Sequence, residues 1–121
     1  MAMSGVKALR GATTIDDDTT EQITERVGEL LTALFERNDL QHQDLISIIF
    51  TATDDIHAMF PAAAARKFGL GDVPLLCARE LDIEGGMPRC IRVLIHLSSD
   101  GGDLHHVYLE EAAGLRDDLP S

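Results

Sequence analysis

Arginine is the residue type whose placement in this chain points most directly to chemistry. Cations are scarce, with 10 Lys and Arg against 21 Asp and Glu. Even so, Arg10 and Arg92 interrupt apolar segments, Arg66 follows a run of alanines, and Arg116 lies near the C-terminus. A guanidinium inside or beside a core needs an anionic partner, because burying it unpaired costs several kcal/mol. That partner is one of the chain's own carboxylates or the anionic group of a ligand, and both can hold at once.

Other residue types that often carry catalysis lack the spacing that their chemistry requires. Cys77 and Cys90 are each typical of small core residues, because a catalytic cysteine needs a nearby base or cation. The five histidines contain no H-E-x-x-H pattern, and no G-x-S-x-G turn is present. The single tyrosine, Tyr108, is typical of core packing with a satisfied hydroxyl. We therefore expect no metal and no cofactor.

Composition restricts the class of protein. With 121 residues, of which 45% are hydrophobic and 26% charged, we expect one globular domain spanning residues 1–121. The net charge of −11 repels nucleic acids and anionic lipid surfaces, so neither is an expected partner. The longest apolar stretch, residues 45–50, is far shorter than the ~20 residues of a membrane helix, and no signal peptide precedes it. A cytoplasmic protein is predicted, and the modest core of so short a chain favours an oligomer.

Hydrophobic periodicity predicts the elements that must position the arginines. The order is a strand, a helix, a strand, a short helix, three strands and a final helical turn, which is typical of an α+β or α/β sheet with helices on one face. Alternation along the fourth strand puts Arg92 on the opposite face from Ile91 and Val93. Glu80 either faces away from Cys77 or begins a loop. The strands are expected at residues 6–12, 45–51, 73–77, 90–98 and 106–109, and the helices at about 19–37, 61–69 and 110–115.

Six segments, in order and spanning nearly the whole chain, resemble the monofunctional bacterial chorismate mutases of the Bacillus subtilis type. They are 9–14 (LRGATT), 51–62 (TATDDIHAMFPA), 73–77 (VPLLC), 89–93 (RCIRV), 106–110 (HVYLE) and 115–119 (LRDDL). The resemblance implies an α+β fold, with a mixed sheet that carries helices on one face. It also implies a homotrimer in which the sheets meet at the centre and the active sites lie between subunits. The implied reaction is the Claisen rearrangement of chorismate to prephenate, on the way to phenylalanine and tyrosine.

The resemblance also implies roles for polar residues. Arg92 would contact the ether oxygen of the breaking C–O bond and a substrate carboxylate, and Arg10 would hold a carboxylate. Glu80 and the Cys77 position would meet the ring hydroxyl, and Tyr108 would support a carboxylate. The implied catalytic residues are thus Arg92, Glu80 and Arg10.

The remaining implied site residues surround the substrate. Phe60 and Leu115 would pack on it, and Leu76 belongs to the same substrate-binding set. Arg66 and Arg116 would lie near the entrance, Arg116 on a mobile C-terminal tail. The chain departs from some relatives at one position, because Ala63 stands where they carry a lysine. The rim of the site is then less positive, and substrate capture depends more on the remaining arginines.

The chemistry of this rearrangement agrees with the residues that the chain has and lacks. One bond breaks and another forms within a single molecule, with no proton to move, so no general base is needed. Holding the flexible dianion in its reactive shape and placing positive charge at the developing oxygen anion are what help. Arginine suits both tasks, because its planar fork binds a carboxylate through two hydrogen bonds and stays charged in a dry cleft.

Two other functions remain open from the sequence. An imine or enamine deaminase shares a small trimeric architecture with clefts between subunits, and it also uses arginine to hold a carboxylate. A regulatory module could bind a small carboxylate metabolite without changing it, because a fold alone does not establish catalysis. Loss of chorismate, release of ammonia, or binding without turnover would separate the three.

Overall fold

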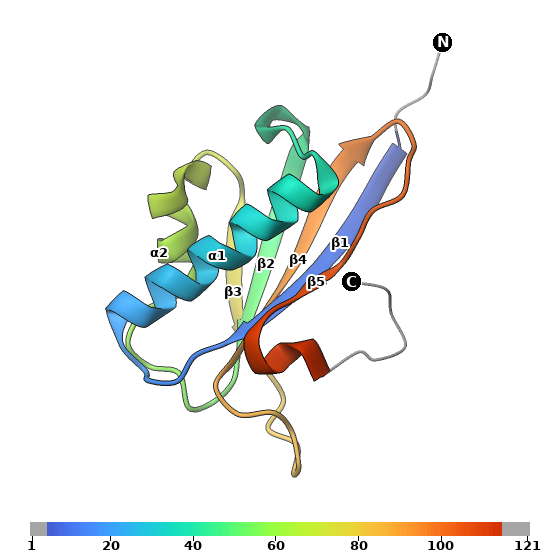
Figure 1. Ribbon diagram of the computed structural model, residues 1–121. Helices are drawn as coiled ribbons and strands as arrows, with labels where there is room; N and C mark the ends of the chain where they lie inside the picture. Colours follow the sequence, from blue (N-terminus) through green and yellow to red (C-terminus); the bar gives the residue numbers. More distant parts are fainter. Residues whose placement is uncertain (1–4, 115–121) are drawn as a thin grey trace.

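Five strands form one sheet within residues 5–114, the part of the chain that the computed structural model describes (Figure 1). Leu115 and Arg116 lie outside the described residues. The spatial order is β3-β2-β4-β1-β5, in which β4 is antiparallel to both neighbours, β3 is parallel to β2, and β5 is parallel to β1. The strands are β1 (Gly5–Thr14), β2 (Leu45–Ala52), β3 (Leu75–Arg79), β4 (Cys90–Ser99) and β5 (Val107–Tyr108).

Two α-helices, α1 (Thr20–Asn38) and α2 (Pro61–Ala65), cover one face of this sheet (Figure 1). The hydroxyl of Thr19 accepts a hydrogen bond from the Gln22 backbone N–H and so caps the start of α1. Asp39, in the left-handed conformation with φ 50°, ends the helix. The expected α+β fold and mixed sheet are confirmed. None of the described helices combines the length and apolarity needed to cross a membrane.

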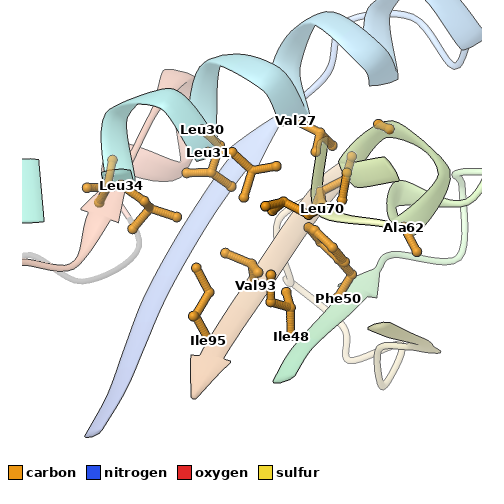
Figure 2. Close-up of a cluster of buried hydrophobic side chains, with 14 of the residues drawn as sticks. Val27, Leu30, Leu31, Leu34, Ile48, Phe50, Ala62, Leu70, Val93 and Ile95 are labelled. Atoms are coloured by element: carbon orange, nitrogen blue, oxygen red, sulfur yellow. The ribbon is translucent and has the colours of Figure 1, made fainter. Parts of the chain in front are cut away.

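The apolar stripe of α1 packs directly on the sheet. Leu30, Leu31 and Leu34 are fully buried, and Figure 2 shows them above Val93 and Ile95 of β4. Burying each such side chain contributes about 1.5–3 kcal/mol. The helix predicted from hydrophobic periodicity at about residues 19–37 is confirmed.

Several boundaries and one placement differ from the sequence predictions. The third strand begins at Leu75 rather than at residue 73, because Val73 closes a turn by donating its backbone N–H to Leu70 O, 3.1 Å away. The first strand is longer than 6–12, because all ten residues of β4 pair with it. The second helix ends early, as α2 passes into a π-helical turn, η2 (Arg66–Leu70), where Gly69 has φ 112°.

The final helical turn does not join α1 and α2 on their face of the sheet. It is a 3₁₀ helix, η3 (Glu110–Gly114), and its Ala112 packs against Ala12 and Cys90, whose side chains lie on the opposite face. The expectation that all helices share one face was therefore wrong for this last element. The strand expected at 106–109 shrinks to Val107 and Tyr108, because only two residues pair with β1.

Gly11 sets how closely α1 approaches β1. A Cβ atom at this position would lie 3.0 Å from Leu34 Cδ1, 3.1 Å from Leu30 Cδ1 and 3.2 Å from the Val107 carbonyl oxygen. We expect Gly11→Ala to lower the free energy of unfolding by about 1–3 kcal/mol, because the close-packed helix must shift to admit the methyl group. Urea denaturation at fixed protein concentration measures this.

A matched control lies in α1 itself. A Cβ at Gly28 would meet nothing within 4 Å, so Gly28→Ala should stabilise the helix by about 0.5–1 kcal/mol. Equal effects of the two substitutions would show that close packing at Gly11 is not what limits the approach of α1.

Candidate active site

The face of the sheet opposite α1 and α2, here called the open face, carries a row of side chains that runs across all five strands. The registers place Tyr108 beside Ala12, Ala12 beside Arg92, Arg92 beside Thr51, and Thr51 beside Ala78. Because cross-strand partners point to the same side of a sheet, these side chains share one face. Arg92 lies on β4, the central strand of the five, so pairing on both sides holds its backbone.

The next row along the open face contains Arg10 and Leu76. Arg10 pairs with Leu94, Leu94 with Ile49, and Ile49 with Leu76. Arg10 therefore lies one strand and one row away from Arg92, whereas Leu76 is on the edge strand β3. Within residues 5–114 the guanidinium of Arg10 makes no hydrogen bond or ion pair, although its backbone N–H donates to His106 Nδ1.

Glu80 is the internal partner of Arg92. It follows the end of β3, where its backbone N–H donates to Ala52 O at 3.0 Å. Its carboxylate accepts a hydrogen bond from Thr51 Oγ1 at 2.9 Å and forms an ion pair with Arg92 Nε. The glutamate side chain is 15% exposed and that of the arginine 42%. Of the two alternatives left by the sequence, Glu80 begins a loop, and it still reaches the open face.

The geometry of this pair leaves part of the guanidinium available. The buried Arg92 Nε has no well-directed hydrogen bond, so its contact with Glu80 is ionic. The two Nη groups make no hydrogen bond to any described residue. A carboxylate thus holds one edge of the fork while its outer donors remain free. Arg92 and Glu80 line a hollow of about 480 Å³, here called the Arg92 hollow. Its other lining residues are Thr53, Asp54, Asp55, His57, Leu81, Asp82, Ile83, Gly86, Met87 and Pro88.

The start of β4 is fixed by Asp55. Its carboxylate accepts hydrogen bonds from the backbone N–H of Arg89, at 3.0 and 3.1 Å, and from Thr53 Oγ1 at 2.6 Å. Thr53 Oγ1 in turn accepts from the Cys90 N–H at 2.9 Å. Arg89 has φ 47°, a left-handed conformation that a non-glycine residue rarely adopts. These bonds hold that turn, which lies three residues before Arg92.

Phe60 and Cys77 lie elsewhere. The register places Cys77 opposite Phe50, on the helix-covered face, and its Sγ accepts a hydrogen bond from the Ala62 N–H at 3.4 Å. Phe60 precedes α2 and is 69% exposed. Both line a second hollow, of about 590 Å³, here called the Phe60 hollow, together with Ala52, Ile56, His57, Ala58, Met59, Pro61, Ala63, Ala78 and Arg79. A single chain therefore does not bring Cys77 and Glu80 together, although His57 lines both hollows.

Other residues suggested by the sequence occupy varied surroundings. Arg66 is exposed in the π-helical turn after α2. Tyr108 is half-buried and packs against the cluster that contains Cys90 and Ala112. Burial raises the pKa of the Cys90 thiol to about 11, so this cysteine is protonated at neutral pH and unsuited to nucleophilic chemistry.

Sequence reasoning missed Asp55 and His57, which line these hollows, and Thr51, which donates a hydrogen bond to Glu80. All three belong to the 51–62 segment that carries the resemblance. Thr51 could have been found from strand alternation, because it lies at the polar end of an apolar strand. No local pattern marks the contact between Asp55 and Arg89, because Arg89 follows Asp55 by 34 residues.

An open sheet face with two arginines, one of them held by a carboxylate, has the donors that recognition of an anionic small molecule requires. Comparison with known proteins identifies the family. The family model for chorismate mutase type I matches residues 6–119. The chain belongs to the chorismate mutase type I family, whose members are isomerases.

Individual relatives agree with this assignment. The chain is 45% identical to chorismate mutase AroH of Thermus thermophilus over 119 residues, which are 96% of this chain and 98% of that protein. It is 39% identical to chorismate mutase AroH of Bacillus subtilis over 117 residues, 94% of this chain and 92% of the relative. A solved chorismate mutase from Clostridium thermocellum has a TM-score of 0.85 and 43% identity, covering 88% of this chain and 97% of that one.

Asp55 makes the stability of this region depend on pH. Burial alone would raise its pKa, but hydrogen bonds from Thr53 and from the Arg89 backbone outweigh burial and lower it from 3.8. A lowered folded-state pKa means that the carboxylate stabilises the fold above pH 3.8, and that this contribution is lost as the pH falls through the folded-state value. We expect Asp55→Asn to cost about 1 kcal/mol at pH 7, a figure reduced for exposure to solvent.

Urea denaturation of both proteins between pH 7 and pH 3 tests this, and the difference should shrink toward acid. Asp100→Asn, at an exposed loop position, is the control. A difference that stays constant over the whole range would show that the charge of Asp55 is not what stabilises the turn.

Proposed function

We propose that the protein converts chorismate to prephenate by an intramolecular Claisen rearrangement, and so serves the synthesis of phenylalanine and tyrosine. The observation that carries the proposal is the Arg92 side chain, which lines a hollow and which Glu80 holds by its Nε edge. The outer donors of Arg92 have no hydrogen-bond partner among residues 5–114. Membership of the chorismate mutase type I family supports the substrate. The family resemblance and the absence of membrane-spanning helices among residues 5–114 support a cytoplasmic protein.

In this proposal Arg92 stabilises the transition state by charge. As the C–O bond breaks, negative charge gathers on the ether oxygen, and a free Nη donor of Arg92 would bind it. One preorganised donor of this kind is typically worth about 3–4 kcal/mol, out of the ~8 kcal/mol needed for a modest enzymatic rate enhancement. Glu80 would orient the fork through Nε with one carboxylate oxygen and leave its other oxygen available to the ring hydroxyl.

Arg10 and Tyr108 would hold the substrate in its compact reactive shape. Arg10 lies on β1, next to β4, and Tyr108 lies on β5, one strand further. Both side chains are on the same face of the sheet as Arg92. The guanidinium of Arg10 has no partner within residues 5–114, so it can accept a carboxylate without breaking an existing ion pair. Restricting two ends of a flexible dianion removes much of the entropy cost of the reaction.

We also propose a homotrimer with active sites between subunits. Large apolar side chains remain exposed near the open face and edge strand β3, including Leu76 at 61%, Leu81 at 86% and Ile83 at 66%. Exposed apolar surface of this extent is typical of an interface. The Phe60 hollow, with Phe60 and Cys77, would then face the Arg92 hollow of a neighbouring subunit. Arg66, Leu115 and Arg116 would complete the entrance, and no metal or cofactor is required.

Removing the charge at Arg92 should abolish most of the turnover. We expect Arg92→Ala, or replacement of Arg92 by the neutral isostere citrulline, to lower kcat at least about 100-fold. The loss of chorismate absorbance measures kcat, and light scattering checks that the oligomer persists. Arg37→Ala, an exposed position at the end of α1, is the control. Near-normal turnover in the citrulline variant would remove Arg92 from the mechanism, and release of ammonia from an imino acid would favour a deaminase.

The absence of proton transfer should be visible in the kinetics. We expect kcat to be nearly flat between about pH 6 and 9, with no appreciable solvent deuterium isotope effect, because no acid or base acts in the transition state. Rate profiles in light and heavy water provide the measurement. A pronounced bell-shaped profile would argue for acid–base catalysis instead.

A further inference from the structure

Arg79 is the only Lys or Arg among the described residues that line the Phe60 hollow. It is the last residue of β3 and lies two residues after Cys77, so the two side chains share the helix-covered side of the strand. Most other lining residues are apolar, and Ala63 and Ala78 contribute only methyl groups. Within residues 5–114 the hollow thus has an apolar wall and a single permanent positive charge.

Arg79 is only lightly restrained by its present partner. Its Nη1 donates to Asp54 Oδ1 at 2.9 Å, and the side chains are 53% and 66% exposed. Ion pairs this exposed contribute little to stability. The remaining guanidinium donors make no hydrogen bond to the described residues. A second carboxylate could therefore bind the fork at low cost.

Asp54 connects this cation to the other hollow. It lines the Arg92 hollow, whereas Arg79 lines the Phe60 hollow, so the ion pair lies between the two. In a chain with net charge −11, a dianion is repelled at distance and needs local positive charge. While Asp54 neutralises Arg79, it competes directly with any incoming carboxylate.

We propose that Arg79 binds a carboxylate of the substrate at the Phe60 hollow, and that Asp54 is the internal counter-ion which that carboxylate displaces. The inference rests on the proposed function for the identity of the substrate. It adds a substrate-binding residue that lies outside the set expected from the sequence. The pair tunes affinity rather than the chemical step, because its ion pair is separate from that of Arg92 with Glu80.

Substituting Arg79 tests the binding role. We expect Arg79→Gln to raise KM for chorismate about tenfold with kcat changed less than about twofold, since the interaction is made equally in ground and transition states. Arg79→Lys should restore part of the affinity. Arg37→Gln makes the same change in net charge at an exposed site away from both hollows and should leave KM unaltered. A KM for Arg79→Gln within twofold of the unaltered protein overturns the proposal.

Substituting Asp54 tests whether it competes with the substrate carboxylate for Arg79. This substitution leaves every arginine in place. We expect Asp54→Asn to lower KM about threefold when Arg79 is present and to leave KM unchanged in the Arg79→Gln background. Asp100→Asn controls for net charge. An equal decrease in both backgrounds would mean general repulsion and would overturn the counter-ion role. Lack of chorismate turnover by the unaltered protein would instead overturn the proposed function, and this inference with it.

Discussion

The ion pair between Arg92 and Glu80 is the interaction on which the site depends. A permanently charged side chain beside a core is tolerated only when an anion offsets its desolvation. Glu80 does so from the end of β3, and Thr51 holds the glutamate from β2. Residues from three adjacent strands therefore converge on one guanidinium. Because the carboxylate contacts the Nε edge alone, the same contact that stabilises the charge leaves the outer donors available for a ligand.

The rest of the fold serves to hold that group still. Helix α1 closes one face of the sheet, and the close approach at Gly11 leaves β1 and β4 little room to move. Asp55 fixes the turn that leads into β4. The Arg92 hollow contains one arginine among several carboxylates, and the Phe60 hollow contains apolar side chains, the Cys77 thiol and Arg79. In the proposed homotrimer, contact between subunits would bring these two parts together.

The features that sequence patterns predicted correctly depend on local periodicity. The stripe of α1 and the alternation that sends Arg92 away from Ile91 follow from neighbours along the chain, and both are confirmed. The position of Glu80 could not be decided, because it depends on where β3 stops pairing with β2. The Asp55–Arg89 contact joins residues 34 positions apart and uses a left-handed turn without glycine, so no local signal marks it.

The alternation along β4 links two properties that many enzymes keep on separate elements. Ile91 and Val93 lie in the core, while Arg92 between them belongs to the candidate site on the open face. Any repacking that shifts the backbone to accommodate a different core side chain also displaces the guanidinium. Core substitutions on β4 that raise thermal stability are consequently expected to change turnover as well. Stabilising substitutions are better placed on the exposed surface of α1.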